Sequence, residues 1–317
     1  MSSEPTFADR PDEIECALPV SRAQAPALWR LVDEVAEQLG TAGPDNLLLV
    51  LGWNSFATEL PVRLVDATVT GRTLGLSLVL LYLSGEDEVR ALVAHELDHF
   101  RRQDTRPQGL AWLLTEFIAM TLAIVAIGGA RLPDPLSAVL RPLARLGFTR
   151  FALWQQARML DREFRADRAA AEIAGTAACA SLLIKSALVA VMWSIIKDEH
   201  LQNLAAKAFP IGAVVAATVR QAFTDRELRD WLGKPKQSAA LRTHPHLVER
   251  LAALGYDLPT AWTLAHSTKT SAAKLLLENP KALDLQLSVW LARRQASASS
   301  ESSALPPSTS DGHDTAS

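Results

Sequence analysis

This 317-residue sequence contains few cysteines and has no excess of positive charge. The two cysteines, Cys16 and Cys179, are too few and too far apart to form a disulfide framework or a cysteine-based zinc site. Lysine and arginine number 32 against 35 aspartates and glutamates, so the net charge is −3. We therefore expect a protein of a reducing compartment without a nucleic-acid partner, because a nucleic-acid site needs a broad basic surface.

The two ends of the sequence lack the patterns of targeted or folded segments. Residues 1–20 have no basic region followed by an apolar run, so we expect an N-terminal extension and not a cleaved secretory signal. Residues 295–317 are rich in Ser, Ala and Pro and almost free of large apolar side chains, which predicts a disordered tail. The folded domain is expected between them, over residues 21–290, in a cytoplasmic protein.

The order of hydrophobic patterns indicates a small sheet followed by helices. Apolar residues make up 49% of the chain, enough for a sizeable core. Their spacing predicts a helix over 22–39 and strands over 47–52 and 62–71. A helix follows over 86–103, and most of the chain from there to residue 255 has helical spacing. The predicted fold class is α+β, a small β-sheet with a predominantly helical body.

The clearest chemical signal is the stretch RALVAHELDHFRRQD, residues 90–104. On a helix His95 and His99 lie one turn apart and point the same way, while Glu96 lies beside them. That arrangement suits a zinc ion held by two imidazoles with a carboxylate near its water. A bare HExxH pattern also arises by chance on a solvated helix face. The apolar flanks indicate a buried helix instead, and buried histidines need partners, which favours a metal.

Two imidazoles do not hold a catalytic zinc, so a further ligand is expected downstream. The segment REFRADRAAA offers Glu163 and Asp167, four residues apart on one helix face. Two such carboxylates repel each other unless each has its own cation or donor. One interpretation pairs both with neighbouring arginines on the surface. The other gives Glu163 to the zinc and Asp167 to the free ring N–H of a zinc-bound histidine. The apolar residues that follow indicate a packed helix and favour the second interpretation.

Three blocks of the sequence together resemble the HtpX-like zinc metalloproteases of peptidase family M48, which are gluzincins. The blocks are EVRALVAHELDHF, REFRADRAAA and RTHPHLVERLAAL, and the resemblance covers about residues 50–255. It implies a zincin-like metalloprotease fold with one zinc ion per chain. It also implies a set of site residues, with His95, His99 and Glu163 as zinc ligands, Glu96 as general base and Asp167 as the carboxylate behind a ligand histidine.

The third block and one departure from the family pattern raise further expectations. By the resemblance His244 would stabilise the developing oxyanion or occupy the open coordination position, and His246 is an alternative that sequence does not separate from it. Arg250 matches the arginine that usually follows this block. Asp98 stands where the family usually has glycine, and it would add negative charge near the metal.

A peptide in a gluzincin-like site joins the exposed edge of a sheet through backbone hydrogen bonds. Residues 65–71, just before the HExxH helix, are our candidate for that edge strand, although an internal strand fits the pattern nearly as well. A cleft of this kind contacts main chain more than side chains. We therefore expect polypeptide substrates and a modest sequence preference.

Residues 109–130 form an apolar segment of 22 residues, long enough to cross a bilayer. Because His99 precedes it and Glu163 follows it, the chain must cross zero or two times for both to reach one ion. The return segment, 135–157, contains three arginines that are unfavourable at membrane depth. We expect a buried or interfacial helical hairpin over 109–157. Peripheral or paired membrane contact stays open, with the active site facing the cytoplasm.

The sequence thus predicts a zinc-dependent endopeptidase in which Glu96 acts as general base. By the resemblance its role would be protein quality control, the turnover of misfolded or membrane-associated proteins. One alternative is a non-catalytic, zinc-stabilised scaffold that binds polypeptides as a chaperone does. Glu96 argues against the scaffold, since a structural zinc gains nothing from a base beside it. A self-cleaving sensor is a third hypothesis, for which no recognition domain is evident.

Overall fold

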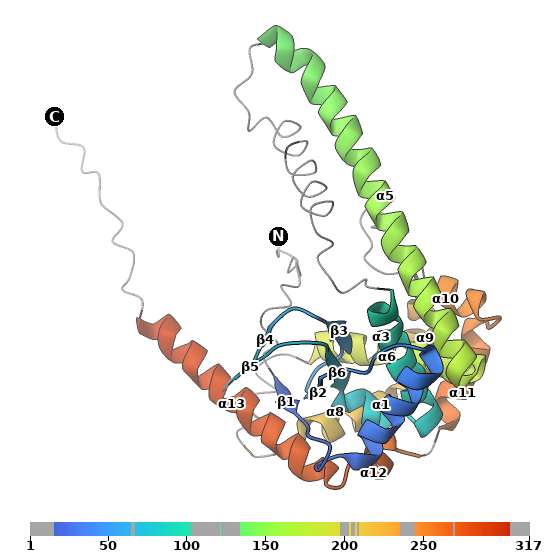
Figure 1. Ribbon diagram of the computed structural model, residues 1–317, viewed down its shortest axis with the longest axis vertical. Helices are drawn as coiled ribbons and strands as arrows, with labels where there is room; N and C mark the ends of the chain where they lie inside the picture. The colour runs from blue at the N-terminus through green and yellow to red at the C-terminus, as the bar shows by residue number, and fades with distance from the viewer. Residues whose placement is uncertain are drawn as a thin grey trace, which may run out of the picture.

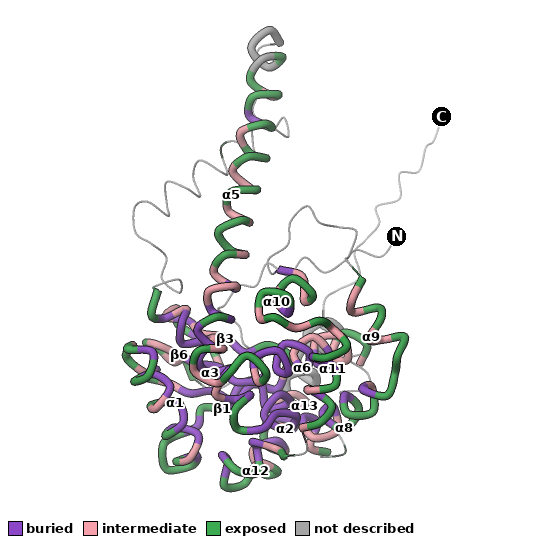
Figure 2. The backbone as a smooth tube through the Cα atoms, turned by 90° about the vertical axis from the view of Figure 1, so that its right-hand side faces the viewer, coloured by how far each residue is buried: buried purple, intermediate pink, exposed green. Residues whose placement is uncertain are grey.

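A sheet of four short strands and a surrounding set of helices form the body of the protein, from which one long helix projects (Figure 1). The computed structural model describes residues 16–64, 67–102, 134–196, 209–234, 245–268 and 270–304, with a few single positions between them. The α+β class predicted from the sequence is confirmed. Buried residues concentrate in the body, while the projecting end of the long helix is mostly exposed (Figure 2).

The main sheet has the strand order β1-β2-β6-β3. Its strands are β1 (Ala17–Pro19), β2 (Asn46–Val50), β3 (Phe56–Thr58) and β6 (Thr73–Ser77). The central pair, β2 and β6, is parallel, and each outer strand is antiparallel to its neighbour. The LLLV run of β2 is buried throughout, as expected for a central strand. The edge that faces away from β1 is therefore β3.

The predicted edge strand at 65–71 is wrong in its placement. Within the described part of the chain, strands β4 (Val62–Arg63) and β5 (Thr68–Val69) pair with each other in a separate two-stranded hairpin and not with the main sheet. Residues 65 and 66 lie outside the described part of the chain. An alternating pattern specifies an extended segment with one buried face, but it does not specify which strand lies beside it.

Helix α1 (Pro26–Leu39) forms where the sequence predicts a helix over 22–39. Its buried face repeats at helical spacing through Leu28, Val32 and Val35. Pro26 occupies the first turn, where its missing N–H leaves no hydrogen bond unmade. Gly40, at φ 65°, ends the helix in the left-handed conformation that glycine adopts readily.

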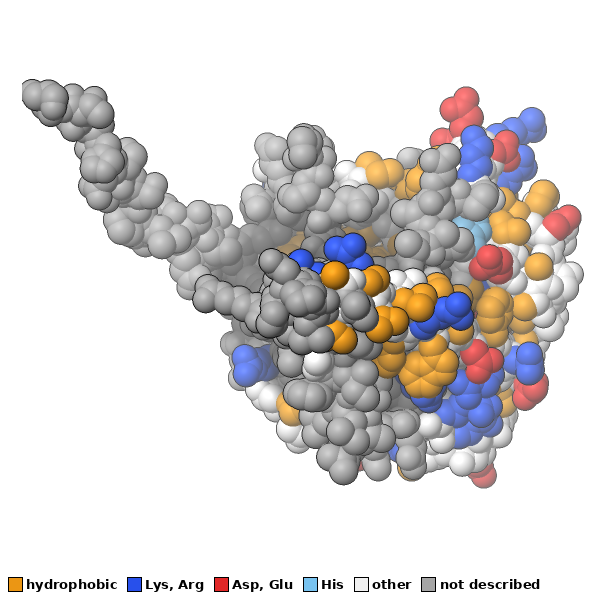
Figure 3. Space-filling model, turned by 90° about the horizontal axis from the view of Figure 1, so that it is seen from above, with side chains coloured by type: hydrophobic (Ala, Val, Ile, Leu, Met, Phe, Trp, Pro, Cys, Tyr) orange, Lys and Arg blue, Asp and Glu red, His pale blue; other side chains and the backbone are white. Residues whose placement is uncertain are grey.

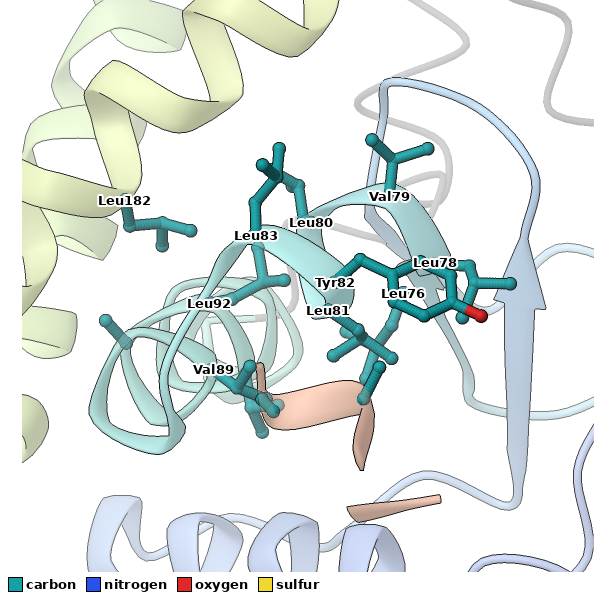
Figure 4. Packing of buried hydrophobic residues seen from close by; sticks show 14 of the residues in the cluster. Leu76, Leu78, Val79, Leu80, Leu81, Tyr82, Leu83, Val89, Leu92 and Leu182 are labelled. Carbon is teal, nitrogen blue, oxygen red and sulfur yellow. The ribbon is translucent and has the colours of Figure 1, made fainter. Parts of the chain in front are cut away.

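The apolar stretch after residue 71 divides into strand β6 and helix α2 (Leu78–Leu83). Ser77 caps the helix, because its hydroxyl accepts a hydrogen bond from the Leu80 N–H at 3.3 Å. All six residues of α2 are buried. Figure 4 shows their side chains packed among Val89 and Leu92 of the next helix and Leu182 from farther along the chain. This internal helix places the HExxH segment directly against the core.

Helix α3 (Glu86–Arg101) confirms the helix predicted over 86–103 and contains the HExxH residues. The Glu88 side chain caps its N-terminus, because Glu88 Oε2 accepts a hydrogen bond from the Gly85 N–H at 2.6 Å. It packs against α1, α5 (Asp134–Ala174) and α6 (Thr176–Ile195). Strand β3 also contacts α3, and a cavity lies between α3, α5 and α6.

Helix α5 is 41 residues long, and its C-terminal part packs against α3 while its N-terminal part projects from the body (Figures 1 and 2). Of the predicted apolar hairpin, 109–130 lies outside the described residues apart from a single position. The return segment, 135–157, is helical as part of α5. Several large apolar side chains on it are exposed, namely Leu140, Leu143, Leu146, Phe148, Leu153 and Trp154. This arm is not buried in the body, so the buried form of the hairpin is excluded for it.

The remaining helices close the core behind α3. They are α8 (Ile211–Ala222), α9 (Arg226–Leu232), α10 (Leu247–Ala253), α11 (Leu258–Ser267), α12 (Ala272–Leu276) and α13 (Pro280–Ala304). Helix α13 continues through the first ten residues of the predicted disordered tail, 295–304, where Ala and Ser alternate without a helix breaker. Residues 305–317 lie outside the described part, as do residues 1–15 of the N-terminal extension.

Among the described residues, α6 is the single helix that is long and apolar enough to span a bilayer. Half of its apolar window is buried inside the protein, which is equally typical of a core helix in a soluble body.

Candidate metal centre

The two histidines of α3 lie one turn apart at the wall of a cavity. Their ring centroids are 5.2 Å apart, and the ring planes are nearly perpendicular, at 84°. The side chains of His95 and His99 are only 12% and 18% exposed. Both rings therefore face a confined space and not bulk solvent.

Helix α5 brings Glu163 to the same point. Its Oε2 lies 3.8 Å from His95 Nε2, and its Oε1 lies 4.0 Å from His99 Nε2. One ligand atom from each of the three residues falls within 4.8 Å of the others. Two ligands that are each about 2.1 Å from one zinc ion lie roughly 3–4 Å apart, so this cluster can close on an ion with small side-chain rotations.

The chemistry of the donor set fits zinc. Two imidazole nitrogens and one carboxylate are three protein ligands, which leaves a fourth position for water or substrate. Structural zinc sites in proteins instead use four protein ligands, usually with cysteine. Neither cysteine completes this set, because Cys16 contacts the backbone of α13 and Cys179 contacts the Asp167 carbonyl at 3.7 Å. Burial and the neighbouring Asp167 charge raise the pKa of Cys179 to about 12, so its thiol stays protonated.

Asp167 lies behind His95, on the side away from Glu163. Its Oδ1 is 3.2 Å from His95 Nδ1, which leaves Nε2 of that ring facing the cluster. Burial alone would raise the pKa of Asp167, but hydrogen bonds from Arg250 and His95 outweigh burial and lower it. The carboxylate is therefore ionised at ordinary pH and can hold His95 as the Nδ1–H tautomer.

Arg250, from α10, neutralises the pair of carboxylates on α5. Its Nε donates to Asp167 Oδ2 at 2.7 Å and its Nη2 to Asp167 Oδ1 at 2.6 Å, a bidentate pair. Its Nη1 also lies 3.4 Å from Glu163 Oε2. The sequence pointed to Arg250 only through the family resemblance. The spacing of the two carboxylates did signal that a cation was needed, but the cation comes from a helix more than eighty positions away instead of from α5 itself.

A cavity of about 500 Å³ opens beside the cluster. His95, Glu96 and His99 line it from α3, and Glu163 lines it from α5. Glu96 is buried, with 8% of its surface exposed. Residues 53–57, which include Asn54 and lead into edge strand β3, form another wall. The cavity thus contains the cluster, a neighbouring carboxylate and the edge of a sheet.

Asp98 does not add uncompensated charge to this cavity, contrary to the expectation from sequence. It is buried and forms ion pairs with Arg101 and Arg102, the latter at 3.0 Å, at the C-terminal end of α3. It is also not among the residues that line the cavity.

The structure gives His246, one of the two candidate histidines of the third block, a role in capping a helix. His246 caps α10, since its Nδ1 accepts a hydrogen bond from the Val248 N–H at 3.3 Å. Its Nε2 lies 3.0 Å from the Lys234 carbonyl oxygen, so both ring nitrogens have backbone partners. His244 lies outside the described residues. Of the two, His244 remains the candidate for the oxyanion group.

Comparison with known proteins identifies the family of the chain. A family model described as peptidase family M48 matches residues 23–257. A Protease HtpX homolog of Pyrococcus abyssi is 31% identical over 184 residues, 52% of this chain and 58% of that protein. Another from Trichormus variabilis is 31% identical over 175 residues, 50% of this chain and 56% of that protein. A third, from Gemmatimonas aurantiaca, is 25% identical over 246 residues, 74% and 77% of the two chains.

The chain spans little more than half the length of the first two relatives, and no solved structure matches it at a significant level. The family model nevertheless covers most of the sequence, and its range includes the HExxH helix, Glu163 and the third block. The chain therefore belongs to peptidase family M48.

Proposed function

We propose that this protein is a zinc-dependent endopeptidase. The observation that carries the proposal is the cluster of His95, His99 and Glu163, which lies with Glu96 on the wall of one cavity. Three ligands and an adjacent buried carboxylate are the parts that hydrolysis by activated water requires. Membership of a peptidase family supports the same reaction.

A bound zinc ion would polarise the scissile carbonyl and lower the pKa of water to about 7. Glu96 takes a proton from the attacking water and delivers it to the departing amide nitrogen. A carbon–oxygen bond forms, the carbon–nitrogen bond breaks, and the products are a carboxylate and an amine. His244 donates a hydrogen bond to the oxyanion that develops on the carbonyl.

Asp167 and Arg250 position the ligands in this proposal. Asp167 accepts the His95 Nδ1–H and so directs Nε2 of that ring toward the ion. Arg250 forms two hydrogen bonds to Asp167 and lies against Glu163. Its positive charge offsets the repulsion between these two carboxylates of α5. In this proposal both residues act through the ligands His95 and Glu163.

Edge strand β3 is our candidate for peptide binding. Among the described strands it pairs with β6 alone, and Phe56 and Ala57 line the cavity beside the cluster. An extended peptide that adds to this strand would satisfy the unpaired backbone groups of β3 and bring a carbonyl to the zinc. The substrate class is therefore polypeptide in extended conformation, as in unfolded proteins.

Membrane contact through α5 and a role in protein quality control complete the proposal. The projecting arm of α5 exposes apolar residues beside Arg145, Arg150 and Arg158, a composition suited to the interface of an anionic bilayer. Figure 3 shows hydrophobic and basic side chains side by side on the face from which the helix projects. We further propose that this arm contacts the cytoplasmic face of a membrane, which would hold the cavity close to damaged membrane-associated proteins.

The experiment is to measure zinc per chain and casein hydrolysis for the wild type, Glu96→Gln and the control Glu86→Gln. Glu86 lies on the same helix but is exposed, with 46% of its side chain accessible. We expect one zinc in all three, full activity in Glu86→Gln and a loss of at least about 100-fold in Glu96→Gln. Equal hydrolysis by Glu96→Gln would exclude the mechanism. Bound zinc without turnover in the wild type would favour the polypeptide-binding scaffold.

A further inference from the structure

Residues 51–55 connect the central strand β2 to the edge strand β3, and two buried serines fix this loop to β6. Ser77, the last residue of β6, donates a hydrogen bond from Oγ to the Gly52 carbonyl oxygen at 2.6 Å. The Ser77 N–H donates to Ser55 Oγ at 3.0 Å. Ser55 is 8% exposed and Ser77 is fully buried. Both ends of the segment 52–55 are therefore held by hydroxyl groups that lie away from solvent.

A third anchor follows at the start of β3. Phe56 pairs with Gly75 of β6, and its ring lies so close to Gly75 that a Cβ atom there would collide with the ring. Glycine at this position therefore lets the ring lie across the strand. Ser77 also caps α2, so the hydroxyl that holds the loop is itself fixed between a strand and a helix. The loop is thus anchored at Gly52, Ser55 and Phe56, and we expect it to be rigid.

Trp53 and Asn54, between the two serine contacts, are exposed and line the cavity beside the candidate metal ligands. Trp53 keeps 38% of its surface accessible, whereas Leu80 and Leu92 in the same lining are 2% and 5% exposed. Single exposed apolar side chains are common on protein surfaces. This one differs because buried polar contacts hold it at the rim of a cavity, where it offers a preformed apolar surface.

The length of β3 determines whether a bound peptide reaches Trp53. Strand β3 has three residues, a length of about 10 Å, whereas an extended peptide of eight residues spans about 26 Å. A peptide of that length that adds to β3 must therefore run past at least one end of the strand. The residues directly before β3, from Trp53 to Ser55, line the cavity, and the residues directly after it do not. A peptide that leaves β3 within the cavity therefore passes Trp53.

We propose that Trp53 contacts the substrate where the peptide leaves β3, and that Ser55 and Ser77 are positioning residues that hold the indole there. The indole adds apolar contact to any extended peptide that is long enough to reach it. It therefore raises affinity with peptide length and selects no particular side chain, in keeping with the modest sequence preference predicted from the sequence. The proposal rests on the proposed peptidase function and adds a binding residue to the same site.

The test compares two quenched fluorescent peptides built around one cleavage site in casein. One contains eight residues, and the other contains only the four residues around the same bond, which span about 13 Å and do not reach the indole. In Trp53→Ala we expect KM to rise about tenfold for the long peptide and to change by less than about twofold for the short one. Zinc should stay at one per chain. Trp231→Ala, at an exposed tryptophan of α9 that does not line the cavity, is the control and should keep both KM values.

Ser55→Ala tests the positioning role. Without the Ser55 hydroxyl the Ser77 N–H loses its partner, and one end of the loop is released. We expect KM for the long peptide to rise about fivefold, and Ser55→Thr, which keeps a hydroxyl, should restore it. Because Ser55 acts through the indole, Ser55→Ala combined with Trp53→Ala should raise KM no further than Trp53→Ala alone. Ser194→Ala, at an exposed serine of α6, is the control and should keep the wild-type KM.

Binding measurements separate this contact from the peptidase proposal. The labelled long peptide is titrated by fluorescence anisotropy against Glu96→Gln and against Glu96→Gln combined with Trp53→Ala, which should bind it about tenfold more weakly. Such weakening without hydrolysis by the wild type would end the peptidase proposal and leave the contact standing. Hydrolysis with an unchanged KM in Trp53→Ala would overturn the contact alone. An effect of Ser55→Ala that adds in full to that of Trp53→Ala would overturn the positioning role.

Discussion

Helix α3 carries two buried polar clusters, seven residues apart along the chain, that differ in how their charges are satisfied. At the first, around Glu88, both carboxylate oxygens lie 2.6 Å from Lys185 Nζ. Three further donors reach the same carboxylate from three segments of the chain, namely the Ser181 hydroxyl, the Thr268 hydroxyl and the Gly85 N–H. This cluster is closed, since its groups satisfy one another within the protein.

The second cluster, around His95, is arranged differently. Its ligand atoms approach one another only to 3.8 and 4.0 Å, beyond hydrogen-bond distance, and they face a cavity. Asp167 contacts the outer side of His95, and Arg250 contacts both Asp167 and Glu163. The comparison shows how one helix can be fixed at one end by a complete ion pair and present at its other end side chains spaced to hold a metal ion.

The largest effect on zinc content and activity should come from removing a proposed ligand from the cluster around His95. In Glu163→Ala only two imidazoles remain, so we expect zinc per chain to fall below about 0.1 after dialysis and casein hydrolysis to fall at least about 100-fold. Metal content is measured by atomic emission and activity by release of labelled casein fragments. The control Glu172→Ala changes an exposed acid on the same helix and should keep both values. Full zinc occupancy in Glu163→Ala would remove Glu163 from the ligand set.

Breaking the closed cluster should affect stability and leave the ligands in place. Lys185→Met leaves the Glu88 carboxylate buried without its cation, so we expect the free energy of unfolding to fall by about 3–5 kcal/mol in urea titrations. The exposed Lys274 supplies the control Lys274→Met, expected to change it by less than about 0.5 kcal/mol. A Lys185→Met protein as stable as the wild type would show that the pair does not hold α3 to α6.

Asp167→Asn should weaken zinc binding, but by less than Glu163→Ala does. The amide no longer fixes the His95 tautomer or pairs with Arg250, so zinc affinity should fall about 10–100-fold, as measured by competition with a chelating dye. Asp161→Asn, at an exposed acid of α5, serves as the control and should keep wild-type affinity. Unchanged zinc affinity in Asp167→Asn would remove Asp167 from the positioning role.

The pH dependence of stability gives a second measurement on the same variant. Hydrogen bonds from Arg250 and His95 hold the pKa of Asp167 below its ordinary value of about 3.9. The stability that Asp167 contributes is therefore present above about pH 4 and is lost as the pH falls through the lowered pKa of the folded state. In zinc-free protein, the free energy of unfolding of Asp167→Asn should depend less on pH below about pH 4 than that of the wild type. An unchanged pH dependence would show that another group governs it.

Local patterns predicted the parts of the molecule that depend on neighbouring residues. The spacing of Leu28, Val32 and Val35 predicted α1, and the HExxH stretch predicted both α3 and the shared direction of its two histidines. The two carboxylates on one helix face, together with the resemblance, indicated Glu163, and the structure brings that residue to the histidines.

Contacts between distant residues could not be predicted in the same way. Glu88 and Lys185 are 97 positions apart, and each alone reads as an ordinary surface charge. Strand β3 is only three residues long, too short for a pattern, yet it forms the sheet edge that was assigned to 65–71. The histidine partner of Asp167 was predicted, but the only cations that the spacing suggested for it were adjacent arginines, because a sequence shows neighbours in the chain and not neighbours in space.

The unbroken length of α5 has a mechanical consequence. Phe148 on the exposed arm and Glu163 at the cluster are 15 residues apart on one helix, a rise of roughly 22 Å. A surface that binds the arm at Phe148 would therefore lie at a fixed distance of roughly 22 Å along the helix from the cavity that holds Glu163. If the proposed peptidase function holds, a substrate anchored in that surface must extend about seven residues beyond it before one of its bonds reaches the cavity.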